Sequence, residues 1–159
     1  MPVEAVPGAA SVVHMHSVET PIGPLWLAAA DGGLGSIAFE GPAGARSEHP
    51  LLRETEEQLR AYFAGELQCF DLPLAPRGTE FQRRVWDAVA AIPHGTTTTY
   101  SGLAAVIGSP RASRAVGAAN GRNPLPIVVP CHRVIGASGA LTGYGGGLDV
   151  KRALLALEA

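Results

Sequence analysis

The chain has 159 residues, with 12 basic and 14 acidic side chains and a formal net charge of −2. Its length fits one domain or two small ones and is enough for a hydrophobic core. The total charge by itself argues for no nucleic-acid partner, and two cysteines suggest neither a disulfide framework nor a metal site. With no secretory signal and no apolar run that could cross a membrane, we expect a soluble cytoplasmic protein.

The charge is divided unevenly along the chain. Residues 1–76 contain three arginines and ten acidic residues, a formal charge of −7, whereas residues 77–159 contain nine basic and four acidic residues, a charge of +5. A basic surface attracts phosphates and an acidic one repels them, so contacts with nucleic acid are expected from the second half. Chance segregation of surface charge is the alternative explanation.

The first half is predicted to begin with strands. Residues 1–12 are expected to form a flexible tail. Residues 13–39 have a β pattern, with strands at 25–29 and 34–39 on either side of the turn Asp31-Gly32-Gly33.

A helix and a linker complete the first half. Leu52, Leu59, Tyr62 and Phe63 have helical spacing, which predicts a helix over residues 51–64 that Gly65 ends. Prolines and a glycine within residues 71–78 indicate a linker. We therefore expect an α/β scaffold domain over residues 13–76 and a second domain over residues 77–159.

The second half is predicted to be mostly helical. Thr79 and Gln82 have the spacing of a capping box, and a helix follows over Phe81–Ala91. Thr99 can cap a second helix, Tyr100–Ile107, and a turn at Gly108-Ser109-Pro110 leads to a third helix at about Ala112–Asn120. Two helices joined by a short glycine-containing turn form a helix-turn-helix, in which the second helix usually lies on DNA.

The third helix is rich in small residues, which permit close approach to a DNA groove. Its charged neighbours are Arg111, Arg114 and Arg122. Alanine and glycine also serve contacts between helices, so a tightly packed core helix is the alternative. The predicted fold class is α+β: a small N-terminal β-sheet/helix domain and a helical C-terminal domain with a winged-helix-like helix-turn-helix.

A cysteine followed by a histidine and an arginine is the strongest chemical signal. The β-branched run Ile127-Val128-Val129 is predicted to form a buried strand that ends near Cys131, and His132 and Arg133 follow. A thiolate is the nucleophilic form of cysteine, and nearby cations favour it. Neighbouring residues on a strand face opposite sides, so Cys131 and His132 can cooperate only if the chain turns at Pro130 or a water links them. An inert buried cysteine is the alternative; Cys69 is expected to be inert.

The segment Pro130-Cys131-His132-Arg133-Val134 resembles the active-site motif of the O6-alkylguanine-DNA alkyltransferases, the methylated-DNA–protein-cysteine methyltransferases. The resemblance covers residues 79–158 in detail and extends more loosely to the first half, through Tyr62-Phe63-Ala64-Gly65-Glu66-Leu67. The ordered set is more specific than any single motif; its other members are Arg111-Ala112-Ser113-Arg114-Ala115-Val116-Gly117, Asn123-Pro124, Gly143-Tyr144-Gly145-Gly146-Gly147-Leu148 and Lys151.

The resemblance implies a DNA-repair function. The family transfers an alkyl group from O6 of guanine in duplex DNA to its own cysteine, in a single turnover after the nucleotide flips out of the helix. It implies that Cys131 is the acceptor, that His132 is a base acting through a water, and that Glu158 orients His132. Asn123 matches a residue that ties the active-site turn to the helix-turn-helix; alone it could be a turn former before Pro124.

The resemblance also implies a base pocket and a DNA surface. Arg114 would fill the gap in the base stack, and Tyr100 would crowd the phosphate and promote nucleotide rotation. The expected pocket residues are Tyr100, Val134, Tyr144 and Gly145, although both tyrosines could be ordinary packing residues. The expected DNA contacts are Tyr100, Arg111, Ser113, Arg114, Ala115, Asn120, Arg122 and Arg133.

Two departures from the family pattern affect these roles. Position 145 is glycine where some relatives carry serine, which removes one hydrogen-bond donor and could widen the pocket. Glu158 is the penultimate residue, so its hold on His132 depends on Leu154, Leu155 and Leu157 anchoring the last helical turn.

The expected partner is double-stranded DNA containing alkylated guanine, with O4-alkylthymine as a further candidate substrate. No cofactor and no metal are expected, because the lesion itself is the alkyl donor. A monomer is expected, and cooperative binding on DNA is left open.

Three other functions remain open. A lesion-sensing relative would flip the base without accepting the alkyl group, but such relatives replace the cysteine. A helix-turn-helix regulator would bind an operator without alkyl transfer. A Cys-His hydrolase acting on peptides or thioesters would turn over many times.

Overall fold

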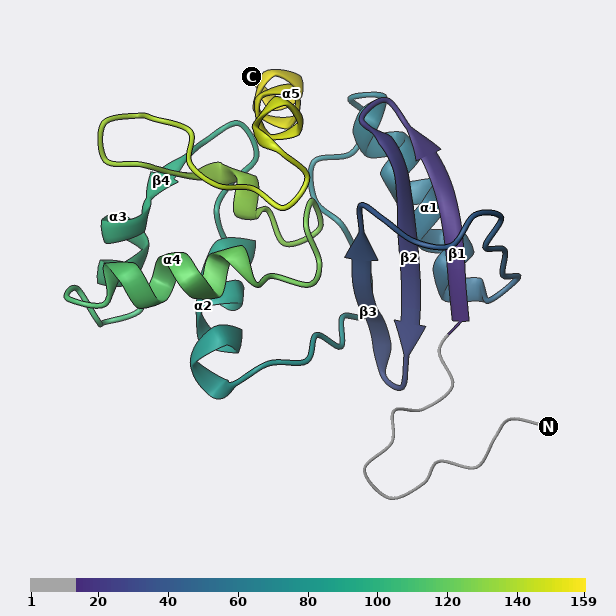
Figure 1. The fold of residues 1–159 in the computed structure, drawn as a ribbon, viewed down its shortest axis with the longest axis horizontal. Coiled ribbons are helices and arrows are strands. Elements are labelled where there is room, and N and C mark those ends of the chain that lie inside the picture. Colours follow the sequence, from purple (N-terminus) through teal and green to yellow (C-terminus); the bar gives the residue numbers. More distant parts are fainter. Residues whose placement is uncertain (1–13) are drawn as a thin grey trace. The chain divides into compact units, whose positions relative to one another are not determined.

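The computed structural model describes residues 14–159, so the tail predicted over residues 1–12 lies outside the described residues. The chain divides into two compact units, one ending at Arg77 and the other running from Gly78 to Ala159. A small antiparallel sheet with one helix and a mostly helical second unit confirm the α+β class (Figure 1). Within the described residues, no helix is long and apolar enough to cross a membrane.

The sheet of the first unit has three antiparallel strands in chain order, β1 (His14–Thr20), β2 (Gly23–Ala30) and β3 (Gly33–Ala38). Val18 of β1 pairs with Leu25 of β2, and both side chains are buried. Along β1, His16 and Val18 are buried while the residues next to them are not, an alternation of period two that is typical of a sheet with one face on the core.

The helix α1 (Pro50–Phe63) packs against the sheet (Figure 1). Leu52, Leu59 and Tyr62 lie on its buried face, as their spacing predicts. The helix begins and ends one residue earlier than expected, because Pro50 takes the first helical position and His49 Nδ1 accepts a hydrogen bond from Leu51 N at 3.2 Å.

Part of the predicted linker belongs to this sheet. Leu34 N donates to Pro73 O and Ala75 N donates to Leu34 O, both at 2.8 Å, so the chain around Leu74 extends β3 as a parallel neighbour. Gly33 permits this approach: its φ is +154°, and a Cβ there would lie 2.5 Å from Pro73 O. The segment is therefore fixed at an edge of the sheet rather than a free linker.

The second unit is built around a helix-turn-helix. Helix α2 (Glu80–Ala90) begins with the predicted capping box, in which Thr79 Oγ1 accepts from Gln82 N at 3.1 Å and Gln82 Oε1 accepts from Thr79 N at 2.9 Å. Helices α3 (Tyr100–Val106) and α4 (Ser113–Gly121) follow, and both pack against α2 (Figure 1).

A second, two-stranded sheet and the C-terminal helix complete the unit. Strand β4 (Thr98–Thr99) pairs in parallel with β5 (Val134–Ile135), a pairing that the sequence patterns do not predict. Helix α5 (Leu148–Glu158) ends the fold and contacts the short 3₁₀ helix η1 (Cys131–Arg133).

The buried strand predicted over residues 127–129 is wrong, because this segment forms a turn. Ile127 has a φ of +76°, and Val129 N donates to Leu125 O at 2.8 Å. Pro126 and Pro130 lack N–H donors, so the segment cannot form a continuous strand ladder even though its residues are β-branched.

Candidate active site

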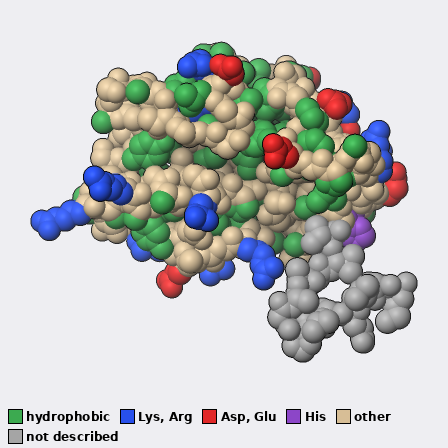
Figure 2. Space-filling view, in the orientation of Figure 1, with side chains coloured by type: hydrophobic (Ala, Val, Ile, Leu, Met, Phe, Trp, Pro, Cys, Tyr) green, Lys and Arg blue, Asp and Glu red, His purple; other side chains and the backbone are tan. Residues whose placement is uncertain are grey.

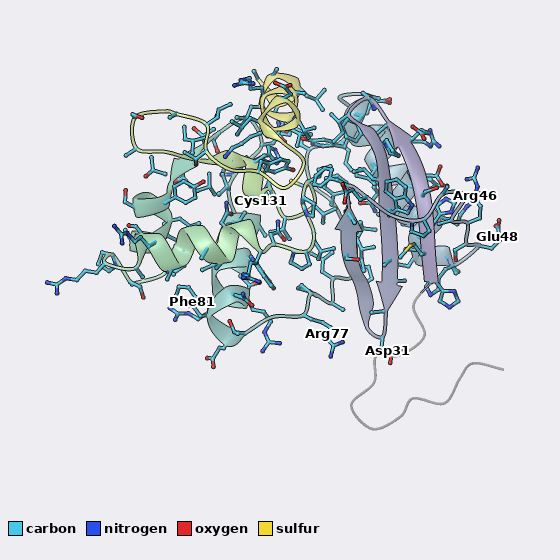
Figure 3. All side chains as sticks on the ribbon, viewed as in Figure 1. Asp31, Arg46, Glu48, Arg77, Phe81 and Cys131 are labelled. Atoms are coloured by element: carbon cyan, nitrogen blue, oxygen red, sulfur yellow. The ribbon has the colours of Figure 1, made fainter. Side chains whose placement is uncertain are left out.

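Cys131 lies inside the second unit as the first residue of η1, which contacts α2 and α5 (Figure 3). It is 7% exposed. The chain turns at Pro130, and Cys131 N donates to Val129 O at 2.7 Å. Asn123 Nδ2 donates to the same carbonyl at 2.8 Å, which joins this turn to the segment that follows α4.

A buried hydrogen-bond network follows directly after the cysteine. Glu158 Oε2 lies 2.8 Å from His132 Nε2, and Arg133 donates through Nε to Oε1 at 2.7 Å and through Nη2 to Oε2 at 2.9 Å. A second Arg133 contact, from Nη1 to Ile92 O at 2.6 Å, fixes the guanidinium. The last turn of α5 is therefore held by a bidentate ion pair as well as by the buried Leu154.

This network defines the tautomer of His132. A carboxylate only accepts hydrogen bonds, so Nε2 carries the proton and Nδ1 holds the lone pair. His132 Nδ1 is buried and has no hydrogen-bond partner among the described residues. It is therefore the nitrogen that can accept a proton from a thiol, directly or through a water.

The pKa values of Cys131 and His132 are shifted in opposite directions. Burial raises the pKa of the Cys131 thiol, and a hydrogen bond from Asn123 together with the charge of Lys151 offsets this only in part. Burial lowers the pKa of His132, although Glu158 favours its charged form. Near neutral pH Cys131 is therefore a thiol and His132 a neutral imidazole. The thiol needs a base to become the nucleophilic thiolate.

Lys151, a member of the motif set, is an internal cation, and its burial is not evident from the sequence. Its side chain is fully buried, and Nζ donates to Val134 O at 2.8 Å and to Thr142 O at 2.9 Å. Burial lowers its pKa. Lys151, Leu154 and Glu158 recur at helical spacing, so this pattern could have placed all three on the buried face of α5.

A pocket of about 640 Å³ lies in the second unit. It is lined by Tyr100, Ser113, Arg114, Gly117, Gly121, Thr142, Gly143, Tyr144 and Gly145. Three of the four residues expected to form the base pocket are thus brought together, although they come from two segments more than 40 residues apart. Tyr100 Oη and Thr142 Oγ1 lie 2.7 Å apart and connect α3 to the other side of the pocket.

Val134 differs from the other expected pocket residues. It is fully buried, and it is not among the residues that line the pocket. Its N–H donates to Cys131 O and its carbonyl accepts from Lys151, so both of its backbone polar groups already have partners within the protein.

The predicted DNA contacts divide into exposed and internal residues. Arg111, Arg114, Ala115 and Arg122 are exposed and Ser113 and Tyr100 half-buried, all on or beside the helix-turn-helix. Lys and Arg side chains lie on the face of the second unit seen in Figure 2. This arrangement suits a surface that binds phosphates.

Two of the predicted DNA contacts are corrected by the structure. Arg133 is 5% exposed and its guanidinium is bound to Glu158 and Ile92 O. Asn120 is 6% exposed and its Nδ2 lies 3.3 Å from Cys131 O. Both side chains are used inside the fold, so the basic surface of the second unit is smaller than its sequence charge implies.

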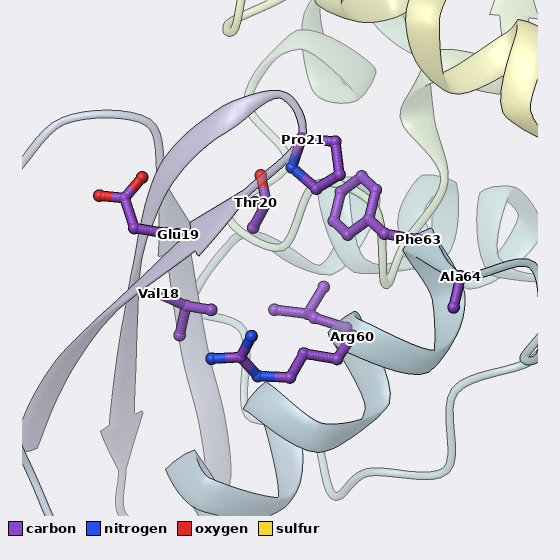
Figure 4. Close-up of a pocket in the computed structure, with 8 residues that line it drawn as sticks. Val18, Glu19, Thr20, Pro21, Arg60, Phe63 and Ala64 are labelled. Carbon is purple, nitrogen blue, oxygen red and sulfur yellow. The ribbon is translucent and has the colours of Figure 1, made fainter.

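The first unit contains a smaller pocket of about 290 Å³ between β1 and α1 (Figure 4). Its walls include Val18, Pro21 and Phe63, and its charged residues are Glu19 and Arg60. Neither cysteine nor histidine is among the residues that line it. Among the described residues, no cluster of His, Cys, Asp or Glu could hold a metal ion.

Comparison with known proteins covers both parts of the chain. Residues 13–76 match the family model of the 6-O-methylguanine DNA methyltransferase ribonuclease-like domain, and residues 80–159 match that of the DNA binding domain. A methylated-DNA–protein-cysteine methyltransferase of Methanosarcina acetivorans is 54% identical over 147 residues, 88% of this chain and 94% of the relative. One of Mycolicibacterium paratuberculosis is 54% identical over 153 residues, 92% and 93% of the two chains.

Solved structures of similar proteins come from the same family as these relatives. The O6-methylguanine methyltransferase of Mycobacterium tuberculosis superposes with a TM-score of 0.83 at 51% identity, over 92% of this chain and 93% of that chain. The structure of Mycobacterium tuberculosis OGT in complex with DNA gives a TM-score of 0.83 at 51% identity, over 91% and 92%. The motifs, the buried cysteine network, the helix-turn-helix and these matches together show that the chain belongs to the 6-O-methylguanine DNA methyltransferase family.

Proposed function

We propose that this protein repairs DNA by transferring a methyl or larger alkyl group from O6 of guanine to Sγ of Cys131. The observation that carries the proposal is the buried network of His132 and Glu158 directly after the only buried cysteine of the described residues. A new S–C bond forms and the O6–C bond breaks, with the electron pair of the broken bond going to the guanine. The guanine takes up the proton that the Cys131 thiol gives up through His132, so neutral guanine is restored and the protein keeps a thioether. Each molecule therefore reacts once.

The proton transfer follows from the hydrogen-bond geometry. His132 Nδ1 accepts the thiol proton, through a bridging water or directly, and Glu158 stabilises the imidazolium that forms. The lowered pKa of His132 keeps it neutral and competent as a base at physiological pH. The raised pKa of Cys131 makes this base necessary.

DNA is the partner that the second unit suits. A guanine inside a duplex cannot reach a cysteine that is 7% exposed, so the alkylated nucleotide must flip out, at a cost of a few kcal/mol. In this proposal Arg114, which is exposed on α4, enters the base stack, and the pocket lined by Tyr100 and Tyr144 receives the flipped base. The Mycobacterium tuberculosis relative solved with DNA supports the same partner for this chain.

The two units have separate roles in this proposal. Residues 13–76 form the scaffold domain, and residues 77–159 carry catalysis and DNA binding. The reaction needs no cofactor, because the lesion supplies the alkyl group. We propose that the protein acts as a cytoplasmic monomer.

The test is the intact mass of the protein after incubation with a duplex containing one O6-methylguanine. We expect one methyl group per molecule, lost in Cys131→Ser and retained in Cys69→Ser, which removes the exposed cysteine as a matched control. Tight lesion binding without a mass gain would indicate a sensor. A Cys-His hydrolase would instead turn over a peptide or thioester repeatedly, and a regulator would bind an operator without gaining mass.

A further inference from the structure

We propose that Asn120 is a positioning residue for Cys131, which links the main chain of the nucleophile to the DNA-reading helix and does not contact DNA. The inference depends on the proposed alkyl transfer. Its basis is the contact from Asn120 Nδ2 to Cys131 O at 3.3 Å, made by a side chain in the last turn of α4.

The end of α4 that carries Asn120 is itself fixed. Trp86 of α2 donates from Nε1 to Ala119 O at 2.8 Å, and Asn120 is 6% exposed. A side chain buried to this degree cannot reach a phosphate or a base edge. It can, however, transmit the position of α4 to the active-site turn.

Asn120 and Asn123 hold the same turn at two points. Asn123 Nδ2 donates to Val129 O at 2.8 Å, and Asn120 Nδ2 approaches Cys131 O, so the carbonyls on both sides of Pro130 each have an asparagine amide as partner. Asn123 is the residue for which the family resemblance already implies this role. Asn120 supplies a second attachment at the nucleophile itself.

The turn has a physical need for such attachments. Ile127 is β-branched and has a φ of +76°, a conformation that such residues rarely adopt. Pro126 and Pro130 have no N–H to donate to a neighbouring strand. Contacts from outside the turn must therefore hold it in place, and the orientation of Sγ depends on them.

Stability does not explain an amide at position 120. Its Oδ1 is buried and has no hydrogen-bond partner among the described residues, and the Nδ2 contact is long. An orphaned buried acceptor costs at least as much as one weak hydrogen bond contributes. Leucine, which has a similar shape and no polar atoms, would satisfy the packing equally well.

The first test is Asn120→Leu. We expect an unchanged or higher Tm and an unchanged affinity for undamaged duplex. The rate of transfer should fall about 10-fold or more, because a small misplacement of a reacting atom is costly. The loss should be equal for a duplex containing O6-methylguanine and for the free base O6-methylguanine, since the nucleophile is common to both reactions.

Gln58→Leu is the matched control in the first unit. Both polar atoms of Gln58 have partners, since Nε2 donates to Asp71 O and Oε1 accepts from Asp71 N, each at 2.9 Å. Removing this satisfied amide should lower Tm and leave the transfer rate of the folded protein unchanged. Asn120→Leu is therefore expected to lower the transfer rate without lowering Tm, and Gln58→Leu to lower Tm without changing the transfer rate.

Asn120→Asp provides a second readout that does not depend on the leucine variant folding. A protonated carboxyl can donate to Cys131 O, whereas a carboxylate repels it, and burial raises the pKa of a carboxyl. The activity of Asn120→Asp relative to wild type should therefore rise as the pH falls. A ratio that is constant with pH would overturn the role assigned to the Nδ2 donor.

Three results with Asn120→Leu would overturn the inference: a lower Tm with an unchanged rate in the folded protein, a loss confined to the duplex reaction, or weaker binding to undamaged duplex. Measuring the wild-type protein in parallel separates a failure of the Asn120 role from a failure of the proposed alkyl transfer. If wild type gains no mass, the alkyl transfer itself fails. If wild type and Asn120→Leu react at the same rate, only the role of Asn120 fails.

Discussion

Replacing Glu158 by glutamine removes a negative charge from the interior of the second unit while preserving the shape of the side chain. Glu158 accepts hydrogen bonds from His132 at 2.8 Å and from Arg133 at 2.7 and 2.9 Å, and its side chain is 1% exposed. The change leaves a buried guanidinium without its counter-charge. It also leaves a single acceptor oxygen where His132 and both Arg133 donors had two, and the new amide NH2 faces one of those donors, so the orientation of the His132 ring is weakened.

The size of the effect follows from this burial. Breaking a buried ion pair by removing one partner costs about 3–5 kcal/mol, which lowers Tm by roughly 10 °C or more in a chain of this size. The protein should nevertheless remain folded at low temperature, because domains have about 5–15 kcal/mol of stability. The transfer rate should fall about 100-fold or more, since a misoriented imidazole loses most of its contribution as a base.

The first unit offers a matched control in Glu56→Gln. Glu56 also binds a buried histidine, His16, with Oε1 2.8 Å from Nε2, and it also pairs with an arginine, Arg60. Arg60 is 63% exposed, so solvent screens this pair and its loss should cost about 1 kcal/mol. The carboxylate lies outside the cysteine network, so the transfer rate of the folded protein should be unchanged.

The assay combines thermal melts by circular dichroism with quenched time courses of intact mass at a temperature where all variants are folded. A wild-type transfer rate in folded Glu158→Gln would contradict the role of Glu158 in orienting His132. So would a loss of rate in Glu56→Gln as large as that in Glu158→Gln.

The remaining predictions concern pH, base flipping and packing. The pKa of His132 is lowered and that of Cys131 is raised, so the transfer rate should be constant from about pH 6.5 to about pH 8.5. The rate should fall only below this range, because His132 then gains a proton. A tenfold rise in rate per pH unit across the range would show that no base acts. Arg114→Ala should slow repair of duplex DNA more than reaction with the free alkylated base, measured by mass gain; equal slowing would contradict a role in flipping. Trp86→Phe should cost about 1–2 kcal/mol in chemical denaturation, because Ala119 O loses its buried donor; an unchanged midpoint would contradict this.

Much of the fold could be predicted from local patterns. The capping box at Thr79 and Gln82 determines the start of α2 through contacts three residues apart, and the spacing of Leu52, Leu59 and Tyr62 identifies the buried face of α1. The Cys-His pair was also recognisable, because the two residues are adjacent. In each case the physical cause acts within a few residues of the chain.

The segment before the cysteine shows where local patterns fail. The β-branched residues 127–129 predict a strand, but the structure has a turn held by Asn123 and bounded by two prolines. Propensity is a weak prior that tertiary contacts override. The short pairing of Thr98 with Val134 could not be found either, because each strand has only two residues.

By itself, the sequence determined most of the helices, the first sheet's strands and the order of the motifs, and it singled out Cys131 and His132 as the candidate nucleophile and base. All of these depend on residue types at short spacing. Only the tertiary structure decided which charged and polar residues are internal. Arg133 meets Glu158 across 25 residues, Lys151 meets Val134 across 17, and Asn120 meets Cys131 across 11. Burial depends on such distant contacts, so an arginine and an asparagine that read as DNA contacts are in fact held inside the active-site network.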